Sequence, residues 1–286
     1  MKHIFLLPIL LFCLISGLSS CKNDVNSRKI VAVSLPPQAS LLKDIVGDYI
    51  DIVTLMKTDA NPESFEVTVK DMRAIADANI YMKAGYLSFE ETLTQRIGES
   101  SRNLQFIDIS DGITPIMGTH SHGGHTHDVA DPHTWTSIPN LKVIAANMLS
   151  AVNGIDPANK DYYTTNYNKL VSRLDSLNQS VSMRLADAGT KSFLIWHPSL
   201  SYFARDYNLE QIPLGQDNKE MTPMQLRDIY EHASNEGVTV IFIQKNYDAR
   251  QAESLANELG IPVIQINPLD DDYLRQFNII TDALTH

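Results

Sequence analysis

A long segment with helical periodicity, residues 156–188, lies in the middle of this sequence, with short apolar runs on both sides of it. Its larger apolar side chains recur every three or four residues and form one stripe, made of Tyr163, Tyr167, Leu170, Leu174, Leu177, Val181 and Leu185. A helix over residues 157–188 is roughly 45 Å long, which is enough to cross a whole domain. A dimeric coiled coil is the alternative, but the stripe is short for one. The segment predicts a rigid connector helix in a monomer.

Strand-like runs alternate with helical segments on both sides of the connector. In the first block, strands are expected over residues 29–35, 50–56, 80–84 and 106–109, and helices over 38–46, 69–78 and 89–97. In the second block, strands are expected over residues 193–196, 238–243 and 262–266, and helices over 200–207, from Thr222 onward and over 250–259. Such alternation is typical of a mostly parallel sheet covered by helices on both faces. We predict an α/β protein with an N-terminal lobe (29–155), the connector (156–188) and a C-terminal lobe (189–286).

The first 28 residues differ from the rest of the chain. Lys2 precedes an apolar run from Ile4 to Ile15, which is too short to span a membrane as a stable helix. The segment Leu18-Ser19-Ser20-Cys21 then resembles a bacterial lipobox, in which Cys21 becomes the lipidated first residue of the mature protein. We expect a lipoprotein signal peptide over residues 1–20, a polar tether over 21–28 and an extracytoplasmic protein anchored to a lipid bilayer. An ordinary secretory signal is the alternative.

Charge and cysteine content limit the possible partners. The chain has 34 acidic residues against 23 Lys and Arg, a net charge of −11, whereas nucleic acids bind basic faces. A nucleic-acid partner is therefore not expected, and a cation remains open. Among the acids, Glu90 and Glu91 begin a helix, where carboxylates favour the positive end of the helix dipole. The other of the two cysteines, Cys13, leaves with the signal peptide, so no disulfide is expected.

Residues with metal-binding chemistry occupy loops near the ends of predicted strands. Glu63 lies in a first-lobe loop, His133 lies in Asp131-Pro132-His133-Thr134-Trp135, and His197 follows the strand that ends at Trp196. Loops at the carboxyl ends of parallel strands converge between two lobes, where ligands collect. Two imidazoles and a carboxylate suit Zn²⁺ and, less well, Mn²⁺ or Fe²⁺. The spacing of these residues alone is not diagnostic.

Two motifs resemble those of a known family, the metal-specific solute-binding lipoproteins of bacterial zinc and manganese ABC importers. Residues 131–135 look like the family's D-P-H-x-W ligand loop, and residues 197–203 with 207–209 look like its H-x-x-(F/L)-x-Y-(F/L)…Y-G-L segment. The similarity runs from Pro36-Pro37 to Asn267-Pro268-Leu269. It implies two lobes with four-stranded sheets, joined by a long helix. It also implies an ion that is delivered to the permease and ATPase of an ABC importer.

The chain departs from the family pattern at three positions. Glu63 stands where the family usually has a first His, Gln244 where many members have Glu, and Asn267 where many have Asp. The resemblance thus implies the metal ligands Glu63, His133 and His197, with Gln244, Asn267 or water as a weaker fourth ligand or support. A site with one carboxylate binds hard metals less well than a site with two. Zn(II) is therefore the expected cargo, and Mn(II) or Fe(II) is the alternative.

A histidine-rich run lies just before the D-P-H motif. Its histidines, which alternate with Gly, Ser and Thr, are His120, His122, His125 and His127. Such a composition does not form a packed core, so a flexible surface loop is expected over residues 119–128. The run resembles the histidine-rich loop of zinc-type family members, and unprotonated imidazoles bind zinc at neutral pH. We expect this run to capture Zn²⁺ as an accessory site.

Two other functions fit parts of the pattern. A metallohydrolase would also use two His, a Glu and an open coordination position to activate water. The chain has no H-E-x-x-H or G-x-S-x-G motif, so an enzyme is not expected. A surface adhesin, in which metal is incidental, would need an exposed aromatic patch. The preferred interpretation is a receptor that captures a metal ion between its lobes and delivers it to an ABC importer.

Overall fold

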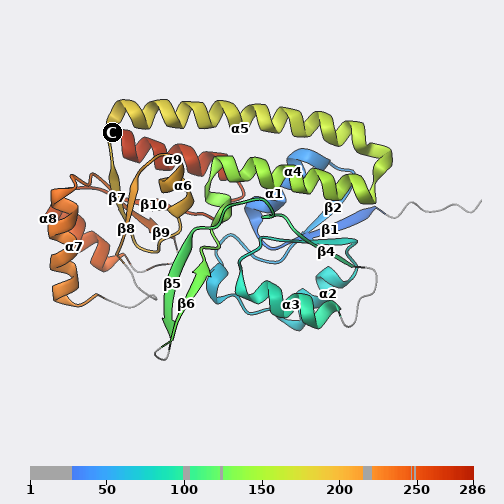
Figure 1. The fold of residues 1–286 in the computed structure, drawn as a ribbon, viewed down its shortest axis with the longest axis horizontal. Helices are drawn as coiled ribbons and strands as arrows, with labels where there is room; N and C mark the ends of the chain where they lie inside the picture. The colour runs from blue at the N-terminus through green and yellow to red at the C-terminus, as the bar shows by residue number, and fades with distance from the viewer. Residues whose placement is uncertain (1–27, 99–103, 123–124, 215–220, 246, 248) are drawn as a thin grey trace, which may run out of the picture.

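Two four-stranded sheets lie side by side in the computed structural model, which describes residues 28–98, 104–122, 125–214, 221–245, 247 and 249–286 (Figure 1). All neighbouring strands within these two sheets are parallel. One long helix, α5 (Lys160–Ala188), runs along both sheets (Figure 1). The predicted class, an α/β protein with two parallel sheets and a long connecting helix, is confirmed.

The N-terminal sheet follows the predicted segments closely. Its strands are β1 (Lys29–Val33), β2 (Ile50–Thr54), β3 (Ile80–Lys83) and β4 (Gln105–Asp108), in the order β2-β1-β3-β4. Its helices are α1 (Pro36–Val46), α2 (Val69–Ala76) and α3 (Ser88–Gly98), and a 3-10 turn, η1 (Pro62–Ser64), precedes α2. Two prolines shortly after the first strand begin α1, because the first turn of a helix has no partners for its N–H groups and so tolerates proline.

The C-terminal sheet repeats this arrangement. Its strands are β7 (Ser192–Ile195), β8 (Glu210–Pro213), β9 (Ile241–Gln244) and β10 (Val263–Ile266), in the order β10-β9-β7-β8. Its helices are α6 (Ser201–Asp206), α7 (Pro223–Asn235), α8 (Arg250–Leu259) and α9 (Tyr273–Thr285). The predicted cap of α7 is confirmed, since the side chains of Thr222 and Gln225 each accept the other's backbone N–H.

One long helix connects the lobes, and the last helix of the first lobe leads into it. α4 (Ile138–Ile155) leads through a 3-10 turn, η3 (Pro157–Asn159), into α5, which has 29 residues. Five members of the predicted stripe are buried, namely Tyr163, Leu170, Leu174, Val181 and Leu185. They face helices of both lobes, because α5 packs against α1 and α4 along its first part and against α9 along its last part (Figure 1). The connector therefore fixes the lobes to each other.

One apolar core continues from the first lobe into the second. It includes Val31 of β1, Leu174 of the connector, Phe277 of α9 and Phe193 of β7. A second cluster covers the other face of the C-terminal sheet, where Leu194 packs under α7 and α8. Neighbouring strand residues thus contribute to different cores, as the pleat of a strand requires. Within the described part of the chain, no helix is long and apolar enough to cross a membrane.

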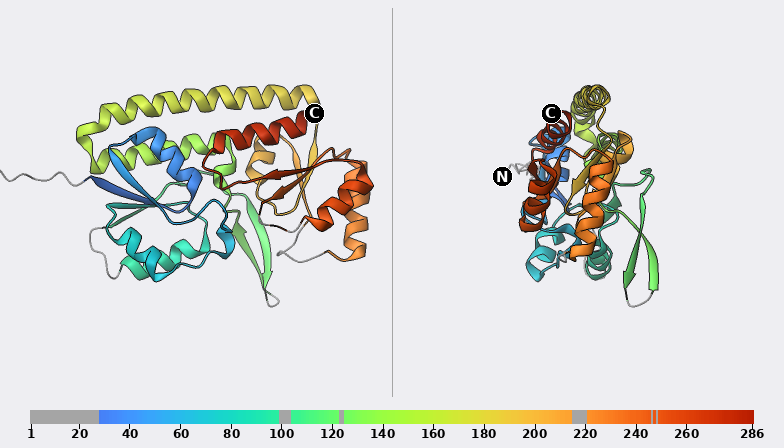
Figure 2. Two further views of the ribbon diagram at one scale, coloured as in Figure 1. Left: turned by 180° about the vertical axis from the view of Figure 1, so that it is seen from behind. Right: turned by 90° about the vertical axis from the view of Figure 1, so that its left-hand side faces the viewer.

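The histidine-rich segment, which was expected to form a loop, contains two paired strands. Its strands, β5 (Met117–His122) and β6 (His125–Ala130), are antiparallel. Their register places histidine opposite histidine twice, in the pairs His120–His127 and His122–His125. Backbone hydrogen bonds between two strands do not depend on apolar side chains, so a polar composition is compatible with pairing. Figure 2 shows the hairpin projecting from the body of the molecule.

The expected helix-dipole role suits Glu91, which is exposed, but it does not describe Glu90, which is buried at 1% exposure. The Glu90 carboxylate accepts the N–H groups of Ala84 and Gly85 and the hydroxyl of Ser34. Burial raises the pKa of Glu90, and these hydrogen bonds oppose the rise. Glu90 therefore ties the ends of β1 and β3 to the first turn of α3.

Candidate metal site

Three side chains with metal-binding chemistry meet between the two lobes. One ligand atom from each of Glu63, His133 and His197 lies within 4.8 Å of the other two. These residues, the principal ligands predicted from the sequence, come from three distant segments. Glu63 lies in η1 after β2, His133 precedes the 3-10 turn η2 (Thr134–Thr136), and His197 follows the end of β7. Two imidazoles and one carboxylate at these distances could hold one metal ion.

Glu63 is placed by the short helical turn η1. The side-chain oxygen of Asn61 accepts the Glu63 N–H at 3.0 Å and so caps the turn. The Glu63 side chain is 40% exposed, and its Oε1 lies 3.5 Å from Nε2 of His197. After the turn, Phe65 packs against Phe89 of α3 with ring centroids 5.0 Å apart. The site is thus open to solvent on the side where Glu63 lies.

His133 is the most buried of the three ligands, at 3% exposure. Its Nδ1 lies 2.8 Å from Oδ1 of Asp131, and the same oxygen accepts the His133 backbone N–H at 2.9 Å. Burial lowers the pKa of His133, but the hydrogen bond and the charge of Asp131 outweigh this effect, so that the net pKa is raised. A carboxylate on Nδ1 orients the ring, leaves Nε2 for a metal and makes that nitrogen a better ligand.

His197 is held in place by the side chain of Gln244. The Gln244 Oε1 accepts the His197 N–H at 3.3 Å, and Nε2 donates to the His197 carbonyl at 2.7 Å and to Ser199 Oγ at 2.8 Å. Burial, followed by the positive charge of His133, lowers the pKa of His197 to about 3. His197 is therefore neutral at physiological pH, which is the form of imidazole that binds metals. Its Nε2 lies 3.4 Å from Nε2 of His133.

Gln244 and Asn267, the predicted fourth ligands or supports, both have amides that are hydrogen-bonded to backbone groups. Gln244 braces the backbone of His197. The Asn267 Nδ2 donates to the carbonyl of Thr58 at 3.1 Å, and its Oδ1 accepts the N–H of Leu269 at 3.1 Å. Asn267 thus joins the second lobe to a loop of the first lobe.

Three residues that support the ligands were not predicted from the sequence. Asp131 carried a signal, because it stands two residues before His133 in the D-P-H motif. Asn61 also carried one, since an Asn before Pro is typical of a helical N-cap. Tyr247, whose ring is nearly parallel to that of His197 with centroids 5.7 Å apart, carried none. Its position depends on β9 lying beside β7, which no local pattern specifies.

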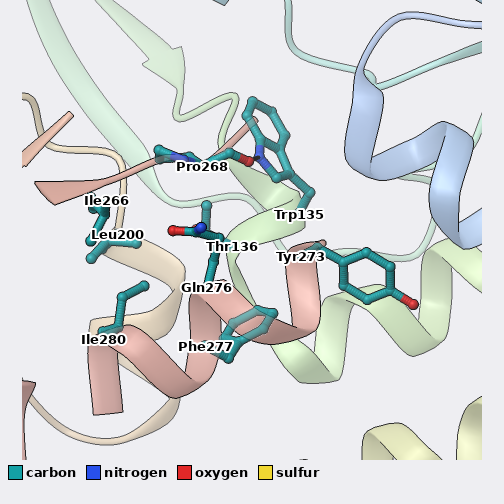
Figure 3. A pocket seen from close by; sticks show the side chains of 9 residues that line it. All are labelled: Trp135, Thr136, Leu200, Ile266, Pro268, Tyr273, Gln276, Phe277 and Ile280. Carbon is teal, nitrogen blue, oxygen red and sulfur yellow. Dashed lines mark hydrogen bonds between the residues drawn. The ribbon is translucent and has the colours of Figure 1, made fainter. Parts of the chain in front are cut away.

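A small apolar cavity lies beside the site, at the junction of the lobes (Figure 3). It is lined by Trp135, Thr136, Leu200, Ile266, Pro268, Tyr273, Gln276, Phe277 and Ile280. The Trp135 Nε1 donates to the carbonyl of Pro268 at 2.8 Å, and the Trp135 ring lies 5.3 Å from that of His133. None of these lining residues offers an imidazole or a carboxylate, so the cavity belongs to the packing behind His133 and not to the ion site.

The remaining predicted site residues are the hairpin histidines and Cys21. His120 and His122 on β5 stand opposite His127 and His125 on β6. Cys21 and the predicted signal peptide lie outside the described residues.

The chain is similar to proteins of zinc uptake. The family described as "Zinc-uptake complex component A periplasmic" (ZnuA) matches residues 31–286. The high-affinity zinc uptake system protein ZnuA of Bacillus subtilis is 28% identical over 272 residues, which cover 89% of this chain and 83% of that protein. The zinc-binding protein AdcA of Streptococcus pyogenes is 24% identical over 275 residues. That match covers 88% of this chain and 53% of AdcA, so the chain spans about half of AdcA.

Solved structures share the fold. A zinc-bound ZnuA deletion mutant has a TM-score of 0.80 at 29% identity, with 90% of this chain and 96% of that chain covered. The laminin-binding protein Lmb of Streptococcus agalactiae, described as an adhesin with metal transporting activity, has a TM-score of 0.77 at 23% identity. That match covers 90% of this chain and 99% of Lmb, and at this identity it shows the fold alone.

Proposed function

This chain belongs to the ZnuA family of periplasmic zinc-uptake components, and we propose that Glu63, His133 and His197 capture one Zn²⁺ between its lobes. The protein is an extracytoplasmic zinc-binding receptor of an ABC uptake system. It is a transport component and not an enzyme, so the metallohydrolase alternative is wrong. The observation that carries the ligand assignment is the convergence of one carboxylate and two imidazoles from both lobes within 4.8 Å.

The donor set favours zinc over harder ions. Two imidazoles with one carboxylate match the ligands of known zinc sites, whereas Mn²⁺ prefers sites richer in carboxylate, carbonyl and water oxygens. The amides of Gln244 and Asn267 are hydrogen-bonded to backbone groups, so we propose water as the fourth ligand. A water ligand exchanges easily, so a ligand of the importer can take its position on the ion during transfer.

Removal of one imidazole tests the ligand assignment. We expect His197→Ala to lower the affinity for Zn²⁺ on the order of 100-fold or more, because one of three protein ligands is lost. The affinity is measured by competition with a chromogenic zinc chelator, and Mn²⁺ is titrated in parallel and should bind more weakly. His232→Ala is the matched control, since His232 is exposed and pairs with Glu210. Wild-type affinity in His197→Ala would remove His197 from the site.

We also propose the hairpin histidines as an accessory capture site for Zn²⁺. Support comes from the register, which places His120 opposite His127 and His122 opposite His125. Directly opposed residues on antiparallel strands are close enough for their side chains to interact.

Replacing all four hairpin histidines by Gln should lower the zinc stoichiometry and slow growth at low zinc, with the main site unaffected. Gln keeps the chain length and leaves the backbone pairing of β5 and β6 in place. Stoichiometry is read by metal analysis after equilibrium dialysis. If deletion of residues 120–127 leaves both stoichiometry and low-zinc growth unchanged, the hairpin has no capture role.

Membrane attachment and the importer complete the proposal. The lipobox-like segment Leu18-Ser19-Ser20-Cys21 supports lipidation of Cys21, with residues 21–28 as a tether. An anchored receptor stays close to the permease and ATPase to which we propose it delivers zinc. We propose that the two lobes comprise residues 29–155 and 189–286 and that the connector comprises residues 156–188. Adhesion, which is named for Lmb, is not extended to this chain.

A further inference from the structure

Tyr247 and Asn61 lie on opposite sides of the metal site. Tyr247 belongs to the second lobe, three residues after the end of β9, and its backbone N–H donates to the Gln244 carbonyl at 3.1 Å. Its ring is stacked on the imidazole of His197 with an interplanar angle of 9°. Asn61 belongs to the first lobe, where it begins η1. Neither residue is itself one of the three converging ligands.

A hydrogen bond joins the two residues across the lobes. The Asn61 Nδ2 donates to the Tyr247 hydroxyl oxygen at 3.3 Å. The other end of the same amide, Oδ1, accepts the backbone N–H of Glu63 at 3.0 Å. The Asn61 amide is therefore bonded at both ends, to the Glu63 turn through Oδ1 and through Nδ2 to the residue whose ring packs against His197.

The phenol group suits a positioning role. Burial, followed by the negative charge of Glu63, raises the pKa of Tyr247 to about 12. A neutral phenol can both accept and donate a hydrogen bond through its hydroxyl. Since Asn61 supplies the proton of their shared hydrogen bond, the O–H of Tyr247 remains free to donate to Glu63 or to a metal-bound water.

We propose that Asn61 and Tyr247 form a cross-lobe bridge that holds Glu63 and His197 together around the ion and slows its release. The inference rests on the proposed function, because it assumes that these two ligands bind the same Zn²⁺. A series of contacts connects the two ligands. The His197 ring stacks on the Tyr247 ring, the Tyr247 hydroxyl accepts from the Asn61 amide, and that amide accepts the Glu63 N–H. Ligands from different lobes must separate before the ion leaves, so a hydrogen bond between the lobes acts mainly on the rate of dissociation.

Stopped-flow release of Zn²⁺ into excess chelator tests the bridge. Tyr247→Phe removes the hydroxyl and keeps the ring on His197, and Asn61→Ser keeps a capping oxygen for the Glu63 N–H but cannot reach Tyr247. We expect each variant to release zinc about fivefold faster, which converts to about 1 kcal/mol for one hydrogen bond. The double variant should be no faster than either single variant, because both remove the same bond. Tyr230→Phe, at a half-buried position of α7, is the control and should release zinc like the wild type.

The outcomes separate the bridge from the proposed function. If His197→Ala binds zinc as tightly as the wild type, the ligand assignment itself fails. If His197→Ala loses affinity but Tyr247→Phe and Asn61→Ser release zinc at the wild-type rate, the bridge alone is overturned. Independent effects that multiply to about 25-fold in the double variant would also overturn it, since they would show that the residues act separately.

Discussion

At the scale of single residues, the three proposed ligands are held by hydrogen bonds from residues outside the proposed ligand set. Asp131 fixes the ring of His133, Gln244 fixes the backbone of His197, and Asn61 caps the turn that carries Glu63. Such supports reduce the freedom that a ligand loses when the metal binds, and so they add to affinity without adding a metal bond.

Replacing Asp131 by Asn should weaken zinc binding about 10- to 100-fold, the usual cost of removing a carboxylate that orients a histidine ligand. The Asn side chain can keep a hydrogen bond to His133 but lacks the negative charge that makes the imidazole a better donor. Chelator competition at neutral pH measures the change. Asp175→Asn is the control, because Asp175 of α5 is exposed and pairs with Lys142 of α4. Equal affinities in both variants would show that Asp131 does not act on the site.

The same substitution should move the pH dependence of binding. Asp131 raises the pKa of His133 above its ordinary 6.5, so a proton competes with zinc below that raised value and affinity falls as the pH decreases through it. Without the carboxylate the pKa of His133 falls, and the loss of affinity should begin at a lower pH. Titrations between about pH 8 and about pH 5 locate this onset. An unchanged onset in Asp131→Asn would contradict the assignment.

The residues of the site were predictable to different degrees. Glu63, His133 and His197 stand beside prolines in loops near predicted strand ends, so their chemistry and position could be inferred from the chain. The roles of Gln244 and Tyr247 could not, because both depend on which strands become neighbours in the sheet. Glu90 is similar, since only the tertiary fold brings Ser34 and Ala84 to one buried carboxylate.

At the scale of elements, periodicity predicted the segments with strong apolar patterns and missed the others. β8 escaped because its sequence, Glu-Gln-Ile-Pro, has one large apolar residue. α4 escaped because most of its residues are apolar, so that no narrow stripe stands out against a polar face. The hairpin carried a signal in Gly123-Gly124 between two runs of equal length, a sequence typical of tight turns. The histidine content had suggested a loop instead.

The connector α5 owes its position to its apolar stripe, and Leu174 is a direct test. Leu174 is fully buried at 0% exposure, so Leu174→Ala should reduce the free energy of unfolding by about 2–5 kcal/mol. Ser172→Ala, at an exposed position of the same helix, should change it little. Urea unfolding followed by circular dichroism gives both values. A loss no larger than in the control would mean that the stripe does not hold the helix against the lobes.

At the scale of the whole molecule, the lobes share one apolar core and should unfold together. The two tryptophans report on different parts of the molecule. Trp135 lies in the continuous core, and Trp196 lies in the separate cluster under α7 and α8. In Trp135→Phe and Trp196→Phe, the urea midpoint from the remaining tryptophan should coincide with the midpoint from circular dichroism. Fluorescence and ellipticity measured on the same samples give these midpoints. Two separate transitions would show that the lobes are independent folding units.

The order of the ligands along the chain also has a consequence for biosynthesis. During synthesis, Glu63 emerges first, His133 follows 70 residues later and His197 another 64 residues later. The brace for His197 is Gln244, a further 47 residues along. A chain that ends before Gln244 would contain all three proposed ligands but would lack the side chain that braces the backbone of His197. We expect such a chain to retain zinc less tightly than the chain that includes Gln244, so that incomplete copies compete poorly for a scarce ion.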